Sequence, residues 1–213
     1  MTKRARQKQI SLWVEGARLR TLPLAVAPIA VGSGAAAAIQ MFQPALAVLA
    51  LAVALFLQIG VNYANDYSDG IRGTDAKRVG PLRLTGSKSV RPQAVKNAAF
   101  IFFALAAAAG IALVVLTQIW WLLAVGAVAI LAAWFYTGGK NPYGYAGFGE
   151  LFVFVFFGLV AVIGTAAAQT GHISWVAVLG GVTCGSLSSA ILVTNNLRDI
   201  PSDTESGKRT LAV

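Results

Sequence analysis

Six apolar runs, each close to the length of a bilayer-spanning helix, limit the folds open to this chain more than any other feature of its sequence. A helix needs roughly 20 apolar residues to cross about 30 Å of hydrocarbon. The runs are continuous rather than alternating, and the chain is 57% hydrophobic and 12% charged, which indicates membrane helices and excludes an ordinary soluble domain. We therefore predict an all-α integral membrane protein, a multi-helix transmembrane bundle with a single domain over residues 1–213. The predicted spanning helices cover residues 22–40, 45–64, 97–117, 119–137, 148–168 and 174–194.

The basic residues are confined to alternate connections between the apolar runs. The turns near 41–44, 117–119 and 169–173 contain no Lys or Arg. By the positive-inside rule, this distribution predicts that both termini and the two polar loops face the cytoplasm, with the protein in the cytoplasmic membrane. The net charge of +9 then belongs to the cytoplasmic membrane face, so we expect the lipid bilayer and no nucleic acid as a partner.

The segment before the first apolar run, ISLWVEGARLR at residues 10–20, combines apolar and basic side chains. This pattern is typical of a short helix that lies at the membrane interface. The side chains predicted to face lipid are Ile10, Trp13, Val14 and Ala17.

Two polar segments that directly follow apolar runs share an Asn-x3-Asp spacing. Asn65 precedes Asp69, and Asn195 precedes Asp199, with Asp203 a further four residues on. Residues four apart lie on one face of a helix, so each pair is predicted to point in one direction. Pro201 predicts that the second helix ends or kinks near residue 200. The recurrence suggests an internal duplication.

Carboxylates at a membrane boundary are costly unless another charge compensates them. If the two polar segments meet, the aspartates of one would repel those of the other. Mg²⁺ would remove this repulsion, since it is typically held by one or two carboxylates, with waters and substrate phosphates in its other positions. The sequence therefore predicts a magnesium and diphosphate site, with nearby Lys and Arg side chains on the phosphate oxygens. The alternative is that these residues are only helix caps and topological charges.

An apolar bundle headed by such a site suits a long isoprenoid diphosphate. Departure of the diphosphate leaves an allylic cation, which an electron-rich aromatic carbon can capture. A cation or metabolite transporter is the alternative of another class. It would place acids near the middle of the bilayer with access from both faces, whereas the acids here are predicted to lie at one face.

Four stretches resemble the UbiA superfamily of intramembrane aromatic prenyltransferases, in the order that the family has them. They are ARLRTLPLAVAPIAVG (17–32), NYANDYSDGIRGTDAKRVGPLRL (62–84), YTGGKNPYGYAGFGELFVFVFFGLVAVIGT (136–165) and TNNLRDIPSDTESGKRTLAV (194–213). The resemblance is strongest to the branch that prenylates 1,4-dihydroxy-2-naphthoate. It implies a helical fold around a cavity open to lipid, with about six of the nine family helices in this chain and an incomplete C-terminal side.

The resemblance also implies roles for individual residues. Asn65, Asp66 and Asp69 match the first acidic motif of the family, and Asn195, Asp199 and Asp203 match the second. Asp66, Asp69, Asp199 and Asp203 would then be catalytic, and together with Asp75 they would be the Mg²⁺ ligands. Many family members outside this branch place the last acid of the first motif where Gly73 stands here. The remaining substrate-binding candidates are Arg78, Arg83, Tyr136, Lys140, Tyr143, Lys208 and Arg209.

The implied reaction is a Mg²⁺-dependent prenyl transfer in menaquinone biosynthesis. A polyprenyl group would pass from polyprenyl diphosphate to 1,4-dihydroxy-2-naphthoate, with decarboxylation, to give demethylmenaquinone. The alternative within the family is a different aromatic acceptor, such as 4-hydroxybenzoate.

Overall fold

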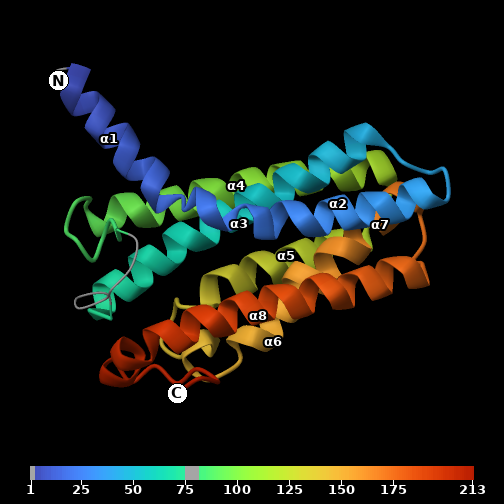
Figure 1. Cartoon of the computed structure of the whole chain (residues 1–213). Helices are drawn as coiled ribbons and strands as arrows, with labels where there is room; N and C mark the ends of the chain where they lie inside the picture. Colours follow the sequence, from blue (N-terminus) through green and yellow to red (C-terminus); the bar gives the residue numbers. More distant parts are fainter. Residues whose placement is uncertain (1–2, 75–81) are drawn as a thin grey trace.

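The computed structural model describes residues 3–74 and 82–213, and this part of the chain is helical (Figure 1). Its elements are α1 (Lys3–Gly16), the 3₁₀ helix η1 (Leu19–Thr21), α2 (Pro23–Ala38), α3 (Pro44–Arg72), α4 (Pro92–Thr117), α5 (Trp121–Phe135), the 3₁₀ helix η2 (Tyr143–Tyr145), α6 (Gly149–Val153), the π-helix η3 (Phe154–Val160), α7 (Ala161–Thr170) and α8 (Trp175–Glu205).

All six apolar runs form helices, as predicted, although they do not form six equal spans. Within the described part of the chain, four helices are long and apolar enough to cross a membrane: α3, α4, the continuous helix Gly149–Thr170, and α8. A fifth candidate is the pair Gln9–Thr21 and Pro23–Ala38, bent by 47°. Helix α5 has 15 residues, about 22 Å at roughly 1.5 Å per residue, and is shorter than the predicted 119–137. The chain is thus a multi-pass membrane bundle.

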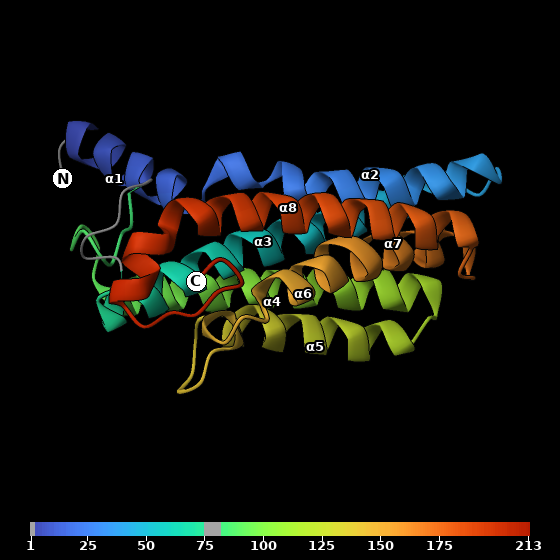
Figure 2. The same ribbon diagram turned by 60° about the horizontal axis from the view of Figure 1, so that its bottom comes forward.

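The acidic motifs of both polar segments are helical, because α3 and α8 continue beyond their apolar runs to Arg72 and Glu205. These two ends lie at the same end of the bundle as the connections 82–91 and 136–148 (Figures 1 and 2). We call this the charged end. The prediction that α8 ends near residue 200 is wrong, since the helix includes Pro201 and continues to Glu205. Hydroxyls of Ser202 and Thr204 bond the carbonyls of Asp199 and Ile200 beside the proline.

The N-terminal helix is only partly as predicted. Ile10 and Val14 are exposed, as expected for lipid-facing side chains. Trp13 and Ala17 instead pack against Tyr63 of α3 in a buried cluster, and the Tyr63 hydroxyl donates to the Trp13 carbonyl at 2.7 Å. The last turn of α1 is therefore held by the bundle, because an aromatic residue with a polar tip lies directly beneath it.

Helix α8 packs closely on the π-helix η3 through glycines. Gly181 and Gly185 of α8 face Gly158 of η3 so closely that a Cβ on Gly185 would lie 2.6 Å from the Phe154 carbonyl oxygen. Small residues four apart allow membrane helices to approach at backbone distance. At the charged end of the same contact, Asn196 donates to the buried Glu150 carboxylate at 2.7 Å.

We predict that Gly158→Ala lowers the apparent melting temperature of the detergent-solubilised protein. A methyl group there would press into the backbone of Gly181 and Gly185, an overpacking that costs about 1–3 kcal/mol. Gly34→Ala is the matched control, since a Cβ at Gly34 of α2 meets nothing within 4 Å. Circular dichroism melts of both variants measure the effect, and equal melting temperatures would contradict the glycine-mediated contact.

Candidate active site

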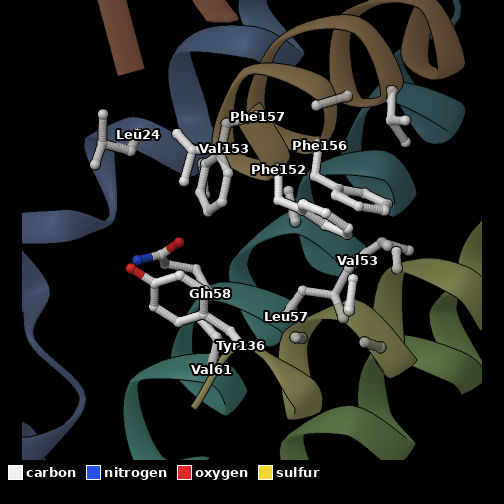
Figure 3. A pocket seen from close by; sticks show the side chains of 18 of the residues that line it. Leu24, Val53, Leu57, Gln58, Val61, Tyr136, Phe152, Val153, Phe156 and Phe157 are labelled. Atoms are coloured by element: carbon white, nitrogen blue, oxygen red, sulfur yellow. The ribbon is translucent and has the colours of Figure 1, made fainter. Parts of the chain in front are cut away.

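A cavity of about 1320 Å³ lies within the bundle, larger than the roughly 300–1,000 Å³ of a pocket for a drug-sized ligand. Its wall combines apolar side chains from several helices with polar side chains at the charged end. Figure 3 shows Val53, Leu57 and Val61 of α3 on one side and Phe152 and Phe156 of α6 and η3 on another. The polar lining residues include Asn65, Asp69, Arg83, Asn195, Asp199 and Lys208.

The Asn-x3-Asp spacing correctly predicts which side chains share a face. Asn65 and Asp69 of α3 both line the cavity, and so do Asn195 and Asp199 of α8. The hydroxyl of Thr137, which follows α5, donates to the side-chain amide oxygen of Asn65, Oδ1, at 2.8 Å. Helices α3 and α8, whose motifs are 130 residues apart in sequence, therefore each contribute one amide and one carboxylate to the wall of the same cavity.

Asp66, by contrast, holds the neighbouring loop. Its two carboxylate oxygens accept hydrogen bonds from the backbone N–H groups of Leu84 and Thr85 at 2.7 and 2.8 Å. These bonds place Arg83 beside Asp69, with Arg83 Nη2 at 3.7 Å from Asp69 Oδ2. Asp66 is 1% exposed, so the loop supplies the compensation that a buried carboxylate requires. Its catalytic and metal-binding roles stay predictions.

The second motif carries its own cations. Asp199 accepts two hydrogen bonds from Arg198, at 2.7 Å from Nε and 3.0 Å from Nη2. Asp203 is buried, with Lys208 Nζ at 3.4 Å from its Oδ2. Arg198 and Lys208 both line the cavity. Arg198 was not among the residues predicted from the sequence, although its position next to Asp199 was a signal for it.

Tyr145 connects the two motifs and was also missed. Its hydroxyl donates to Asp69 Oδ1 at 2.9 Å. The Arg72 guanidinium and the Lys208 ammonium lie over its ring, at 5.1 and 5.7 Å from the ring centre, within reach of a cation–π interaction. Its carbonyl accepts from the Arg209 backbone N–H at 3.1 Å. Burial, and next the Asp69 charge, raise the pKa of Tyr145, so the phenol remains a donor to Asp69.

Only some of the other predicted residues line the cavity. Tyr136 and Tyr143 line the cavity with ring centres 5.5 Å apart, and burial raises the pKa of both phenols. The side chains of Lys140 and Arg209 are exposed. Gly73 ends α3 in a left-handed conformation with φ of 81°, which suits a residue without a Cβ. Asp75 and Arg78 lie outside the described residues.

The oxygen atoms that line the cavity are of the chemical type that binds Mg²⁺. Two carboxylates, Asp69 and Asp199, and two amides, Asn65 and Asn195, offer oxygen atoms, the ligands that a hard cation prefers. Within residues 3–74 and 82–213, no group of three or more His, Cys, Asp or Glu side chains could hold an ion. Asp69 and Asp199 are carboxylates of the kind that hold Mg²⁺ where substrate phosphates supply its other ligands.

Comparisons with known proteins identify the family to which the chain is similar. Residues 25–213 match the UbiA prenyltransferase family. The chain is 58% identical over 201 residues to a 1,4-dihydroxy-2-naphthoate octaprenyltransferase of Mycobacterium tuberculosis, covering 94% of this chain and 68% of the relative. An Escherichia coli protein of the same name is 42% identical over 216 residues, covering 97% and 70%. The UbiA prenyltransferase domain-containing protein 1 of Danio rerio is 28% identical over 214 residues, covering 97% and 62%.

We predict that Asp66→Asn loosens the connection that follows residue 81. An asparagine offers one carbonyl oxygen to two buried N–H groups, and one unsatisfied buried donor costs about 1–3 kcal/mol. Trypsin should then cleave after Lys88, which precedes Ser89, several times faster than in the wild type. Asp199→Asn is the matched control. It makes the same change in a carboxylate whose hydrogen bonds come from Arg198 and not from the backbone of this loop. Identical cleavage rates in all three proteins would refute the loop-holding role of Asp66.

Proposed function

The chain belongs to the UbiA prenyltransferase family, and on this premise we propose that it transfers a polyprenyl group from polyprenyl diphosphate to 1,4-dihydroxy-2-naphthoate. The observation that carries the proposal is the cavity, which joins a charged region to a long apolar wall. A substrate with a diphosphate head and an isoprenoid chain has the same two parts. The product is demethylmenaquinone in its quinol form, an intermediate of menaquinone biosynthesis.

The cationic side chains of the cavity would bind the diphosphate. Arg83, Arg198 and Lys208 all line its wall, and each lies within 4 Å of an aspartate. Guanidinium groups form paired, charge-assisted hydrogen bonds with phosphate oxygens, and a lysine adds a compact positive charge. The aspartates thus keep the cations in place, while the apolar wall beyond them receives the prenyl chain.

Mg²⁺ is the second part of the proposal. Asp69 and Asp199, with the amide oxygens of Asn65 and Asn195, would hold it. When bound, the ion would offset the negative charge of the diphosphate and of the two carboxylates. Asp75 remains a further candidate ligand. Tyr145 would steady Asp69 in this arrangement, because its hydroxyl bonds one carboxylate oxygen.

The chemistry then requires little covalent participation by the protein. The bond between the first prenyl carbon and the diphosphate oxygen breaks, and its electron pair leaves with the diphosphate. The ring carbon that bears the carboxylate donates electrons to the allylic cation and forms the new carbon–carbon bond. The carboxylate leaves as carbon dioxide, and its electron pair restores the aromatic ring. Arg83, Arg198 and Lys208 would assist by stabilising charge on the departing oxygens.

Naphthoate is favoured over 4-hydroxybenzoate by the names of the relatives. The Mycobacterium tuberculosis and Escherichia coli proteins, at 58% and 42% identity, both carry the naphthoate name. For the orientation, we infer that the charged end faces the cytoplasm, because the basic residues of the described chain gather there. Both substrates would then reach the site from the cytoplasmic side and the lipid.

We predict that purified protein prenylates 1,4-dihydroxy-2-naphthoate only with a divalent cation. Asp69→Ala and Asp199→Ala should each lower the rate by about 100-fold or more, since they remove charge that organises the leaving group. Glu205→Ala, an acid at the exposed end of α8, is the control. Chromatography of the prenylated naphthol with and without EDTA measures the effect, and full turnover in EDTA would exclude the metal.

Three glycines widen the part of the cavity that lies away from the charged end. Gly110, Gly126 and Gly164 line its wall from α4, α5 and α7. A Cβ at Gly126 or Gly164 would meet nothing within 4 Å, and at Gly110 only Val53 at 3.8 Å. A helical glycine costs about 1 kcal/mol relative to alanine, and helix packing does not require these three. Their effect is space in which the far part of a long prenyl chain can lie.

Gly126→Leu is therefore predicted to act on donor length. It should lower the rate with octaprenyl diphosphate by roughly tenfold or more, the size of effect expected from obstructing an apolar pocket, and leave the rate with geranyl diphosphate near the wild-type value. Gly34→Leu, also in open space but away from the cavity, should change neither rate. Equal losses with both donors would argue against a role in chain length.

A further inference from the structure

Gln58 lies in the apolar middle of α3, lines the cavity and is only half hydrogen-bonded. It is 6% exposed. Its Nε2 donates to Thr21 Oγ1 at 2.9 Å, whereas its Oε1 is buried with no hydrogen-bond partner among the described residues. Figure 3 shows the Gln58 amide and the Tyr136 hydroxyl directed toward the same part of the cavity.

The hydrogen bonds of Thr21 establish which Gln58 atom is unpaired. The Thr21 hydroxyl donates its one proton to the Arg18 carbonyl at 2.9 Å, so its oxygen can only accept. It accepts from Gln58 Nε2 and also from Asn62 Nδ2, at 3.0 Å. A reversed Gln58 amide would place two acceptors against each other. The atom left for a ligand is therefore the Gln58 carbonyl oxygen, which needs a donor.

The chemistry of the substrates identifies that donor. Leaving a buried carbonyl oxygen unpaired costs about 1–3 kcal/mol, so a ligand that pairs it gains affinity. A diphosphate offers acceptors, and a prenyl chain offers neither donors nor acceptors. Only the aromatic substrate carries hydroxyl groups. In 1,4-dihydroxy-2-naphthoate the 1-hydroxyl lies beside the carboxylate and bonds it internally, so the 4-hydroxyl is the donor free to bind the protein.

We propose that Gln58 Oε1 accepts a hydrogen bond from the 4-hydroxyl of the aromatic acceptor and fixes its orientation in the cavity. The inference rests on the proposed function and adds an acceptor-binding residue to it. Gln58 lies seven residues before Asn65, roughly 10 Å along α3. The ring would therefore lie between Gln58 and the diphosphate site, against the apolar wall that includes Phe152.

Gln58 acts in this arrangement as a positioning residue and not as a base. An amide oxygen does not remove a proton from a phenol, so the bond selects and orients a hydroxyl-bearing ring. A site built to bond a substrate hydroxyl rejects an analogue without it much more strongly than an apolar pocket does. Gln58 would thereby select acceptors that have a hydroxyl opposite the one beside the carboxylate.

The test uses 1,4-dihydroxy-2-naphthoate as the acceptor substrate and 1-hydroxy-2-naphthoate, which lacks the 4-hydroxyl, as a competitive inhibitor. It compares how tightly the protein binds the two compounds. In the wild type, the inhibition constant of the analogue should exceed the KM of the acceptor by about tenfold or more. In Gln58→Leu this ratio should approach one, because the variant cannot accept a hydrogen bond from the 4-hydroxyl and so binds both compounds alike. The KM for the prenyl donor should stay unchanged. Gln93→Leu, an exposed glutamine of α4, should keep the wild-type ratio.

Each other result has a distinct meaning. Equal binding of the two compounds by the wild-type protein would overturn the inference without any variant, so a Gln58→Leu protein that fails to fold leaves the test intact. A Gln58→Leu protein with the wild-type ratio would overturn it as well. Wild-type protein that turns over the naphthoate but shows no preference would refute only the Gln58 contact. Wild-type protein without turnover on any donor would refute the proposed function itself.

Discussion

The compensation of buried carboxylates at the end of an apolar bundle is the constraint on which the remaining structure depends. Asp66, Asp69, Asp199 and Asp203 are all buried, and an unpaired charge in such a place would cost several kcal/mol. Each therefore has a partner: two backbone amides for Asp66, and Arg83, Arg198 or Lys208 for the others. The loop after residue 81 and the segment after α8 are folded against the helices because they provide these partners.

The same contacts join parts of the chain that are distant in sequence. Tyr145 contacts Asp69 and the cation of Arg72 from the end of α3, and Lys208 from the segment after α8. Arg72 also donates to the carbonyls of Thr137 and Gly139. A single aromatic residue in the short connection before α6 thus links both acidic motifs, so that the geometry of one depends on the other.

Much of this could be read from the sequence, because hydrophobic length and helical periodicity are local properties. The six helices, and the shared faces of Asn65 with Asp69 and of Asn195 with Asp199, follow from them. The role of Asp66 could not be foreseen, since its partners lie 18 and 19 residues away on an irregular loop. Tyr145 depends on three segments meeting, which no spacing encodes. Gln58 was visible as a polar residue within an apolar run, but its unpaired oxygen depends on Thr21.

The π-helix between α6 and α7 determines which side chains of this span face α8 and which face the cavity. A π-helical turn holds one residue more than an α-helical turn, and one residue corresponds to about 100° of rotation on a helix. Gly158 can therefore meet α8 while Phe156 before it and Gly164 after it both face the cavity. Deleting one residue from Phe154–Val160 would keep the composition of the span nearly intact, yet it would rotate Ala161–Thr170 and turn the open wall at Gly164 away from the substrate.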